Sequence, residues 1–132
     1  MKETIQQLKD LIYKYPENIE GRQIRPVLGY PEEKFIAKRE FKVGYNYYIG
    51  VNYFEDGKLA AITWVKLKNG NWFLHRVGGP ASYTFRPFTE EVLFVEYYLH
   101  GIDYPNEQKY YKACIENGFI EKDNPEALAN II

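Results

Sequence analysis

The sequence predicts an α+β fold: an antiparallel β-meander of about six strands, with an N-terminal and a C-terminal helix packed on it. Apolar residues recur at helical spacing only near the two ends of the chain, and they alternate with polar residues through the middle. Asp-Gly and Asn-Gly pairs, which tolerate the positive φ angles of tight hairpin turns, divide this middle part. A length of 132 residues, 45% of them hydrophobic and 27% charged, fits one globular domain over residues 1–132.

A first helix is predicted just after the N-terminus. Thr4 and Gln7 have the spacing of a capping box, in which the hydroxyl and the amide bind free backbone groups of the first turn. Apolar residues follow at helical spacing until Pro16, which ends the helix. They are Ile5, Leu8, Ile12 and Tyr15. The next segment contains several Gly and Pro residues, so we expect a loop with one short strand around Gln23–Leu28.

Alternating apolar residues, together with aromatic and β-branched ones, predict the six strands. The turns between them are marked by Gly44, Asp56-Gly57, Asn69-Gly70, Gly78-Gly79-Pro80 and Pro87-Phe88-Thr89, and His100-Gly101 is expected to form a further tight turn. The predicted strands cover residues 35–43, 45–54, 59–67, 71–76, 81–86 and 92–99.

The C-terminal helix is predicted to begin after Asn106, whose side chain can cap it. Gly118 ends the helix, and Phe119 is placed to fold back on Cys114. A last short helical turn is expected around 124–126, where Pro occupies the first helical position.

Composition and charge exclude several function classes. The net charge is −1 and no basic run is longer than Lys38-Arg39, so nucleic acid is an unlikely partner. No apolar stretch reaches membrane-spanning length and the N-terminus lacks the apolar core of a signal peptide, so we expect no membrane partner and a cytoplasmic location. The single cysteine rules out an intrachain disulfide framework.

Few side chains suggest catalysis. His75 and Arg76 have the chemistry of an acid/base beside an anion clamp, but adjacent strand residues point to opposite faces, so we do not expect them to serve one ligand. His75, His100 and Cys114 lack the local spacing of a zinc site, and a mid-helix thiol is expected to be buried and inert. The sequence therefore predicts no catalytic residue, no metal and no cofactor.

The aromatic residues are the strongest functional signal: 13 Tyr, 8 Phe and 2 Trp make up 17% of the chain. Along the second strand, alternate residues share a face. One face, which we expect to be core, carries Tyr45, Tyr47, Ile49, Val51 and Tyr53, and the other carries Asn46, Tyr48, Gly50, Asn52 and Phe54. A mixed Asn, Gly and aromatic face suits a surface that stacks a ring and hydrogen-bonds its edges. The predicted ligand- or partner-binding residues are Tyr48, Asn52, Trp64, Trp72, His75, Arg76 and Arg86, the arginines as anion contacts. A purely structural role for these tyrosines, as good strand formers, is equally open.

Two stretches of the chain resemble a repeat of phage and large-virus proteins. They are His75-Arg76-Val77-Gly78-Gly79-Pro80-Ala81 and Glu96-Tyr97-Tyr98-Leu99-His100-Gly101. The repeats read His-Arg-x-Asp-Gly-Pro-Ala and then a strand ending Glu-Trp-Tyr-x-Asn-Gly, and they are β-hairpin units similar to membrane-occupation (MORN) repeats. Gly78, Tyr97 and His100 depart from this pattern, and the resemblance covers about one unit over residues 69–117. It implies a phage or mobile-element origin and a non-enzymatic scaffold without catalytic residues.

The sequence thus favours a non-enzymatic binding protein that blocks a host protein or sequesters a small aromatic, nucleotide-like ligand on a Tyr/Trp-rich sheet. One alternative is a small hydrolase acting on phosphate esters through His75 and Arg76, with His100 as a further candidate. Another is a structural or assembly component of a virion, in which the sheet mediates self-association into a homo-oligomer.

Overall fold

Helix α1 (Ile5–Tyr13) begins at the predicted capping box. Thr4 Oγ1 accepts a hydrogen bond from the Gln7 N–H at 3.1 Å, and Gln7 Oε1 accepts one from the Thr4 N–H at 2.8 Å. Leu8 and Ile12 lie on the helix face that is buried against the sheet. The computed structural model describes residues 3–18 and 37–120, apart from the side chains of residues 37 and 38. The strand predicted at 23–28 and the turn predicted at 124–126 lie outside these ranges.

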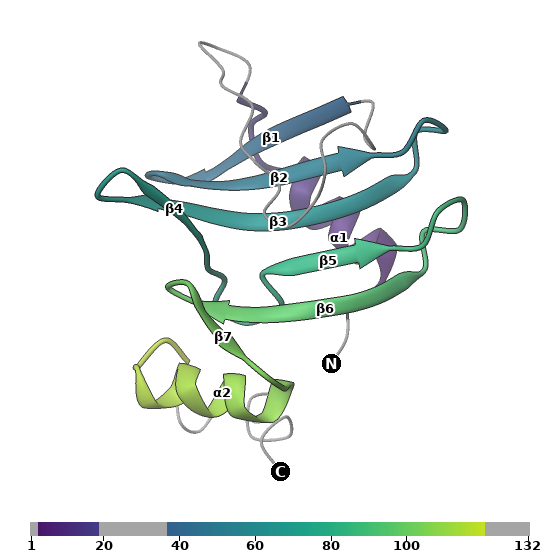
Figure 1. Ribbon diagram of the computed structural model, residues 1–132. Coiled ribbons are helices and arrows are strands. Elements are labelled where there is room, and N and C mark those ends of the chain that lie inside the picture. The colour runs from purple at the N-terminus through teal and green to yellow at the C-terminus, as the bar shows by residue number, and fades with distance from the viewer. Residues whose placement is uncertain (1–2, 19–36, 121–132) are drawn as a thin grey trace.

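Seven antiparallel strands form the sheet in the described part of the chain, in the order β1-β2-β3-β5-β6-β7, with β4 paired to β3 (Figure 1). The predicted α+β fold is confirmed, and the first six strands match the six predicted ones. A seventh short strand follows the predicted turn at His100 and Gly101, whose φ angles are +48° and +81°. The strands are β1 (Ala37–Gly44), β2 (Tyr47–Tyr53), β3 (Leu59–Lys68), β4 (Asn71–Leu74), β5 (Ser82–Phe85), β6 (Val92–Leu99) and β7 (Ile102–Tyr104).

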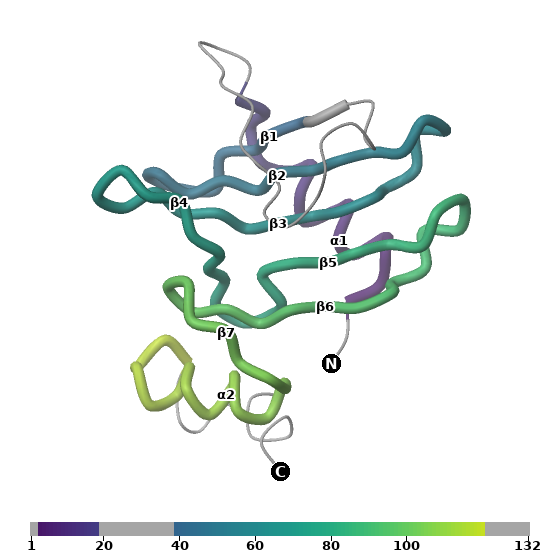
Figure 2. Tube along the Cα trace, viewed as in Figure 1, coloured from purple at the N-terminus to yellow at the C-terminus, as the bar shows by residue number. Residues whose placement is uncertain are grey.

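Strand β3 is long enough to pair with two strands along one edge. Val65–Lys68 pairs with β4, and Ala61–Thr63 pairs with β5. Between these two strands the chain leaves the sheet over residues 75–81 and returns, as the trace in Figure 2 shows. A simple meander would have paired β4 with β5. Instead, both lie beside β3, and the interruption forms a loop close to β6.

The main core lies between α1 and one face of the sheet (Figure 1). Ile49 and Val51 of β2 are fully buried there, as the alternation predicted, together with Phe41, Leu59, Ile62, Trp64, Tyr83 and Phe85. The prediction that Tyr45 belongs to this core is wrong: β2 begins only at Tyr47, and the turn before it, with a φ angle of +51° at Asn46, leaves 86% of the Tyr45 surface exposed.

Helix α2 (Glu107–Glu116) forms a second cluster beside β6 and β7. Asn106 Oδ1 caps it by accepting from the Lys109 N–H at 2.8 Å, and Gly118, with a φ angle of +74°, follows its last turn, both as predicted. Tyr110 and Cys114 are fully buried in this cluster. Among the described residues, no helix is long and apolar enough to cross a membrane.

Candidate functional site

The predicted Tyr/Trp surface does not form as a single exposed face. Trp64 alternates with Thr63 on the central strand β3 and faces α1, so that only 3% of its surface is exposed. Its ring packs against Tyr83, with ring centres 6.0 Å apart. The prediction that Trp64 presents an open surface is therefore wrong, because a central strand buries the face that meets the helix.

Asn52 is also buried, although it lies on the opposite face of the sheet from α1. Its exposed fraction is 0%, and within residues 3–18 and 37–120 neither Oδ1 nor Nδ2 has a hydrogen-bond partner. Thr63 and Ser82, from the neighbouring strands, are buried on the same face. Alternation showed which residues share this face but not that it is covered, so the predicted exposure of Asn52 is wrong. Tyr48 and Trp72 do meet, with ring centres 5.9 Å apart, and both are half-buried.

Arg76 belongs to a buried network that ties the N-terminal segment to the sheet. Its Nη1 and Nη2 donate to the Glu3 carboxylate oxygens at 2.9 and 2.8 Å, and its guanidinium carbon lies 4.0 Å from the centre of the Trp64 ring. The Tyr83 hydroxyl donates to Glu3 Oε1 at 2.6 Å. Burial alone lowers the pKa of Arg76, but the hydrogen bonds and charge of Glu3 outweigh it and raise this pKa.

The same contacts, which raise the pKa of Arg76, lower the pKa of Glu3. Burial raises the pKa of its carboxyl, and the hydrogen bonds and charge of Arg76 outweigh burial, so this pKa is lowered. The ion pair satisfies both groups. Arg86 forms an exposed ion pair with Glu91 at 3.3 Å. Both predicted anion contacts therefore already bind a carboxylate.

The two histidines lie together, which the sequence did not predict. Their ring centres are 4.1 Å apart and their planes are inclined at 26°. The backbone N–H of His100 donates to His75 Nδ1 at 2.9 Å. The neutral ring of His75 therefore carries its proton on Nε2. Burial, followed by the nearby His100 and Lys66, lowers the pKa of His75 to about 4.

This histidine pair shows no converging catalytic or metal-binding set. The contacts of His75 are with His100, Tyr47 and Phe119, whereas those of Arg76 are with Glu3, Trp64 and Pro80. The two side chains thus have different partners, as expected, although residues 75 and 76 lie beyond the end of β4 and not within a strand. Within residues 3–18 and 37–120, no group of three or more His, Cys, Asp or Glu side chains is placed to hold a metal ion. Burial raises the pKa of the Cys114 thiol, which suits an inert core residue.

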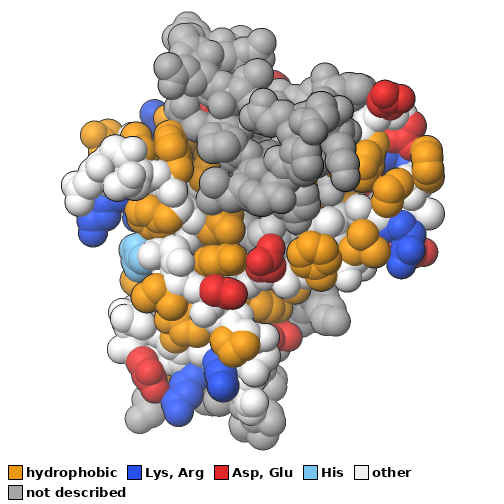
Figure 3. Space-filling model, in the orientation of Figure 1, with side chains coloured by type: hydrophobic (Ala, Val, Ile, Leu, Met, Phe, Trp, Pro, Cys, Tyr) orange, Lys and Arg blue, Asp and Glu red, His pale blue; other side chains and the backbone are white. Residues whose placement is uncertain are grey.

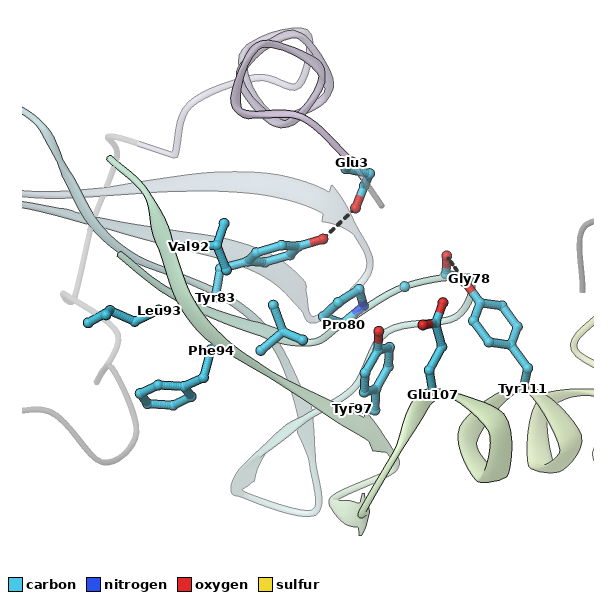
Figure 4. A pocket seen from close by; sticks show the side chains of 12 residues that line it. Glu3, Gly78, Pro80, Tyr83, Val92, Leu93, Phe94, Tyr97, Glu107 and Tyr111 are labelled. Atoms are coloured by element: carbon cyan, nitrogen blue, oxygen red, sulfur yellow. Dashed lines mark hydrogen bonds between the residues drawn. The ribbon is translucent and has the colours of Figure 1, made fainter. Parts of the chain in front are cut away.

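A pocket of about 380 Å³ lies where β6, the loop after β4 and the start of α2 meet (Figure 4). The loop contributes Gly78, Gly79 and Pro80. Aromatic and aliphatic side chains form most of the walls of the pocket: Tyr83, Val92, Leu93, Phe94, Val95, Tyr97 and Tyr111. The charged groups that line it are the carboxylates of Glu3 and Glu107, with no cation among the described lining residues. A pocket of this size with few polar groups is typical of a ligand site.

Two polar groups of the pocket have no hydrogen-bond or ion-pair partner among the described residues: the Glu107 carboxylate and the Tyr97 hydroxyl. Figure 4 shows both side chains directed toward the loop at Gly78 and Pro80. Glu107 is the first residue of α2, where the helix dipole stabilises its negative charge. Burial, followed by the charge of Glu107, raises the pKa of Tyr97 to about 12, so its hydroxyl stays protonated at neutral pH.

The first half of β6 borders this pocket, and no described strand pairs along its outer edge. On one side it pairs with β5, from Val92 to Glu96; on the other side β7 pairs only with Tyr97–Leu99. Along the free edge Val92, Leu93 and Phe94 are 43%, 45% and 51% exposed. Figure 3 shows hydrophobic side chains on the surface where β6 runs.

Sequence reasoning missed this edge and this pocket. The available signal was the run Val92-Leu93-Phe94, because three consecutive apolar residues do not fit a strand with one wet face. The pocket itself combines four segments that are distant in the sequence, around residues 3, 78–83, 92–97 and 107–111. No local spacing could have indicated it.

A comparison with protein-family models, with curated proteins and with solved structures found no match. The resemblance to the phage and large-virus repeats therefore rests on the residues quoted for it. In the structure the two stretches that carry it lie side by side. The backbone N–H of Arg76 donates to the Tyr98 carbonyl at 3.2 Å, and the backbone N–H of Ala81 donates to the Glu96 carbonyl at 2.9 Å.

Proposed function

We propose that this protein is a non-enzymatic binding protein that recognises an extended segment of a partner protein by strand addition to the free edge of β6. The observation that carries the proposal is the exposed apolar run Val92–Phe94 along an edge with which no described strand pairs, directly beside the pocket. An added strand would gain backbone hydrogen bonds from the edge and would direct alternate side chains toward the pocket.

The energetics of a sheet edge support this proposal. An edge presents unpaired N–H and C=O groups, and proteins usually protect it with charged residues, Pro or a covering element. β6 instead exposes three large apolar side chains, each of which stabilises a complex by roughly 1–2 kcal/mol when a partner covers it. A partner is the simplest reason for leaving such an edge open.

Charge argues against a nucleotide or another phosphate-bearing ligand at this site. The pocket is lined by two carboxylates, and the two arginines expected as anion contacts are already paired with Glu3 and Glu91. A phosphate would meet like charge there, which is unfavourable. β6 itself contains no Lys or Arg, so a second copy paired through its own β6 would bring no cation on that strand. A different protein is therefore favoured over both.

The test is selection from a random-peptide display library on the immobilised full-length protein. We expect enriched peptides to alternate apolar residues in the manner of a β-strand. Their affinity should fall about tenfold or more in the Val92→Gln/Phe94→Gln double variant, because two apolar contacts are lost. Fluorescence anisotropy with labelled peptides measures the change.

The matched control is the double variant Tyr45→Gln/Ile102→Gln, which changes two exposed apolar residues outside the free half of β6. It should bind the peptides as the wild type does. Equal loss in both variants, or no loss in either, would contradict binding at this edge. A stable dimer in light scattering that the β6 variant dissociates would show that a second copy occupies the edge instead.

A further inference from the structure

We infer that the pocket beside β6 is a recognition site for a basic side chain, an arginine or lysine of the docked segment. This inference rests on the proposed function, because it specifies which residue the added strand places in the pocket. It predicts that binding is selective for a positive charge at one position of the partner.

The first argument is the set of polar groups that lack a partner. The Glu107 carboxylate accepts hydrogen bonds but cannot donate them, and the Tyr97 hydroxyl can accept one as well. Neither has a partner among the described residues. A guanidinium or an ammonium brings several N–H donors and a charge opposite to that of Glu107, so it satisfies both groups. A neutral apolar side chain would leave them unpaired.

The second argument concerns the other carboxylate of the pocket. Both oxygens of Glu3 already accept hydrogen bonds, from Arg76 and from Tyr83. Its charge is balanced by Arg76, so Glu107 supplies the net negative charge of the pocket. One unbalanced carboxylate fits one monovalent cation.

The third argument is the apolar and aromatic wall. The stems of arginine and lysine are aliphatic and pack along apolar surfaces while the charged end reaches polar groups. Tyr97 and Tyr111 lie on either side of Glu107 (Figure 4), and Phe94 and Val95 also line the pocket. Aromatic faces next to a cation add a favourable interaction, which is stronger for the planar guanidinium. We therefore expect arginine to bind more tightly than lysine.

The experiment titrates the ¹⁵N-labelled full-length protein with Nα-acetyl-arginine amide and follows amide chemical shifts. The matched ligand is Nα-acetyl-citrulline amide, which has nearly the same shape without the charge. We expect saturable shifts in the loop at Gly78–Gly79 and at the start of α2 with the arginine compound, and an affinity about tenfold or more weaker with citrulline. Equal affinity for the two compounds, or no saturable shift with either, would overturn the inference.

Protein variants provide the second arm. Glu107→Gln keeps the size of the side chain and should reduce arginine-amide affinity about tenfold. Glu116→Gln, at the exposed far end of the same helix, should leave it unchanged. Unfolding in urea checks that both variants remain folded. A Glu107→Gln variant that is folded and binds as the wild type does would also overturn the inference.

A third arm separates this inference from the proposed function. Peptides selected on the protein are resynthesised with citrulline in place of arginine, or with norleucine in place of lysine. If these changes leave affinity intact while the β6 variant abolishes binding, strand addition stands and the basic-residue pocket is wrong. If arginine amide binds through Glu107 while the β6 variant has no effect on peptides, the pocket stands and strand addition is wrong.

Discussion

Single residues show that burial in this protein is not matched everywhere by hydrogen bonding. Arg76 and Glu3 are buried or half-buried and mutually satisfied, whereas the Asn52 amide is fully buried and has no hydrogen-bond partner in the described part of the chain. An unpaired buried amide costs roughly 1–3 kcal/mol relative to the unfolded state, in which water binds it. Asn52 is thus a local weakness within a strongly paired strand.

We expect Asn52→Val to raise the free energy of unfolding by about 1 kcal/mol, because it removes the unpaired amide and favours the strand conformation. The Asn52→Asp variant should have the opposite effect, since it buries a charge without a partner. Urea unfolding at neutral pH measures both. Two outcomes would contradict the buried, unpaired state of this amide. One is a higher free energy of unfolding for Asn52→Asp, and the other is a decrease for Asn52→Val as large as that for Asn52→Asp.

His75 makes stability depend on pH. Its folded-state pKa of about 4 lies below the ordinary 6.5, so between these values the unfolded state binds more protons than the folded state. The contribution of neutral His75 is complete above pH 6.5 and is lost as the pH falls toward 4. The expected loss is on the order of 2 kcal/mol.

The measurement compares urea unfolding at neutral pH and at the acidic end of this window, for the wild type and for His75→Asn. The asparagine side chain can still accept the His100 N–H, but it does not titrate. The variant should therefore lose less stability on acidification. An identical loss in the two proteins would show that other groups account for the pH dependence.

At the scale of elements, the sequence predicted most of the helices and strands and little of the site. The capping box at Thr4, the turn at Asn69-Gly70 and the period-two strands each depend on neighbouring residues, so local rules located them. The pairing of both β4 and β5 with β3 depends on contacts between distant segments. The same holds for the cover over Asn52 and for the pocket, because alternation does not specify what lies opposite a face.

The loop between β4 and β5 depends on a close approach at Gly79. A Cβ atom at this position would lie 2.8 Å from the Arg76 guanidinium carbon, too near for van der Waals contact. We expect Gly79→Ala to displace Arg76 from Trp64 and Glu3 and to cost roughly 1–3 kcal/mol. Urea unfolding followed by tryptophan fluorescence measures the cost.

Two further variants test this cause. Gly44→Ala places its Cβ at an ordinary 3.9 Å from Tyr47 Cβ and should change stability little. In a Glu3→Gln/Arg76→Met background the guanidinium is absent, so the cost of Gly79→Ala should shrink markedly. A cost that is unchanged in that background would mean that the loop backbone, and not Arg76, requires glycine.

In the whole molecule, the same loop is where three parts of the fold meet. The N-terminal segment binds it through Glu3, and α2 binds it through tyrosine hydroxyls. Tyr110 donates to Arg76 O and accepts from the Gly79 N–H at 3.2 Å, while Tyr111 donates to Gly78 O at 3.0 Å. Apart from these bonds, α2 contacts the sheet mainly at β6 and β7.

We expect Tyr110→Phe to loosen α2 without opening the central sheet, because it leaves a buried N–H and C=O unpaired at a cost of about 2 kcal/mol. Native-state hydrogen exchange should show faster exchange of the α2 amides, with β2 and β3 amides changed less. Tyr45→Phe, at an exposed turn, serves as the control and should change neither. Equal acceleration in all elements would indicate that α2 and the sheet open as one unit.

The bonds to residues 76–79 also determine how this protein would respond to mechanical load. If residues 3 and 120 were pulled apart, tension would first reach the Glu3–Arg76 ion pair and the hydrogen bonds of the Tyr110 and Tyr111 hydroxyls. It would reach the backbone hydrogen bonds between β2 and β3 only afterwards. The terminal helices would detach first, each in its own small step. The central strands would resist as a separate and later barrier.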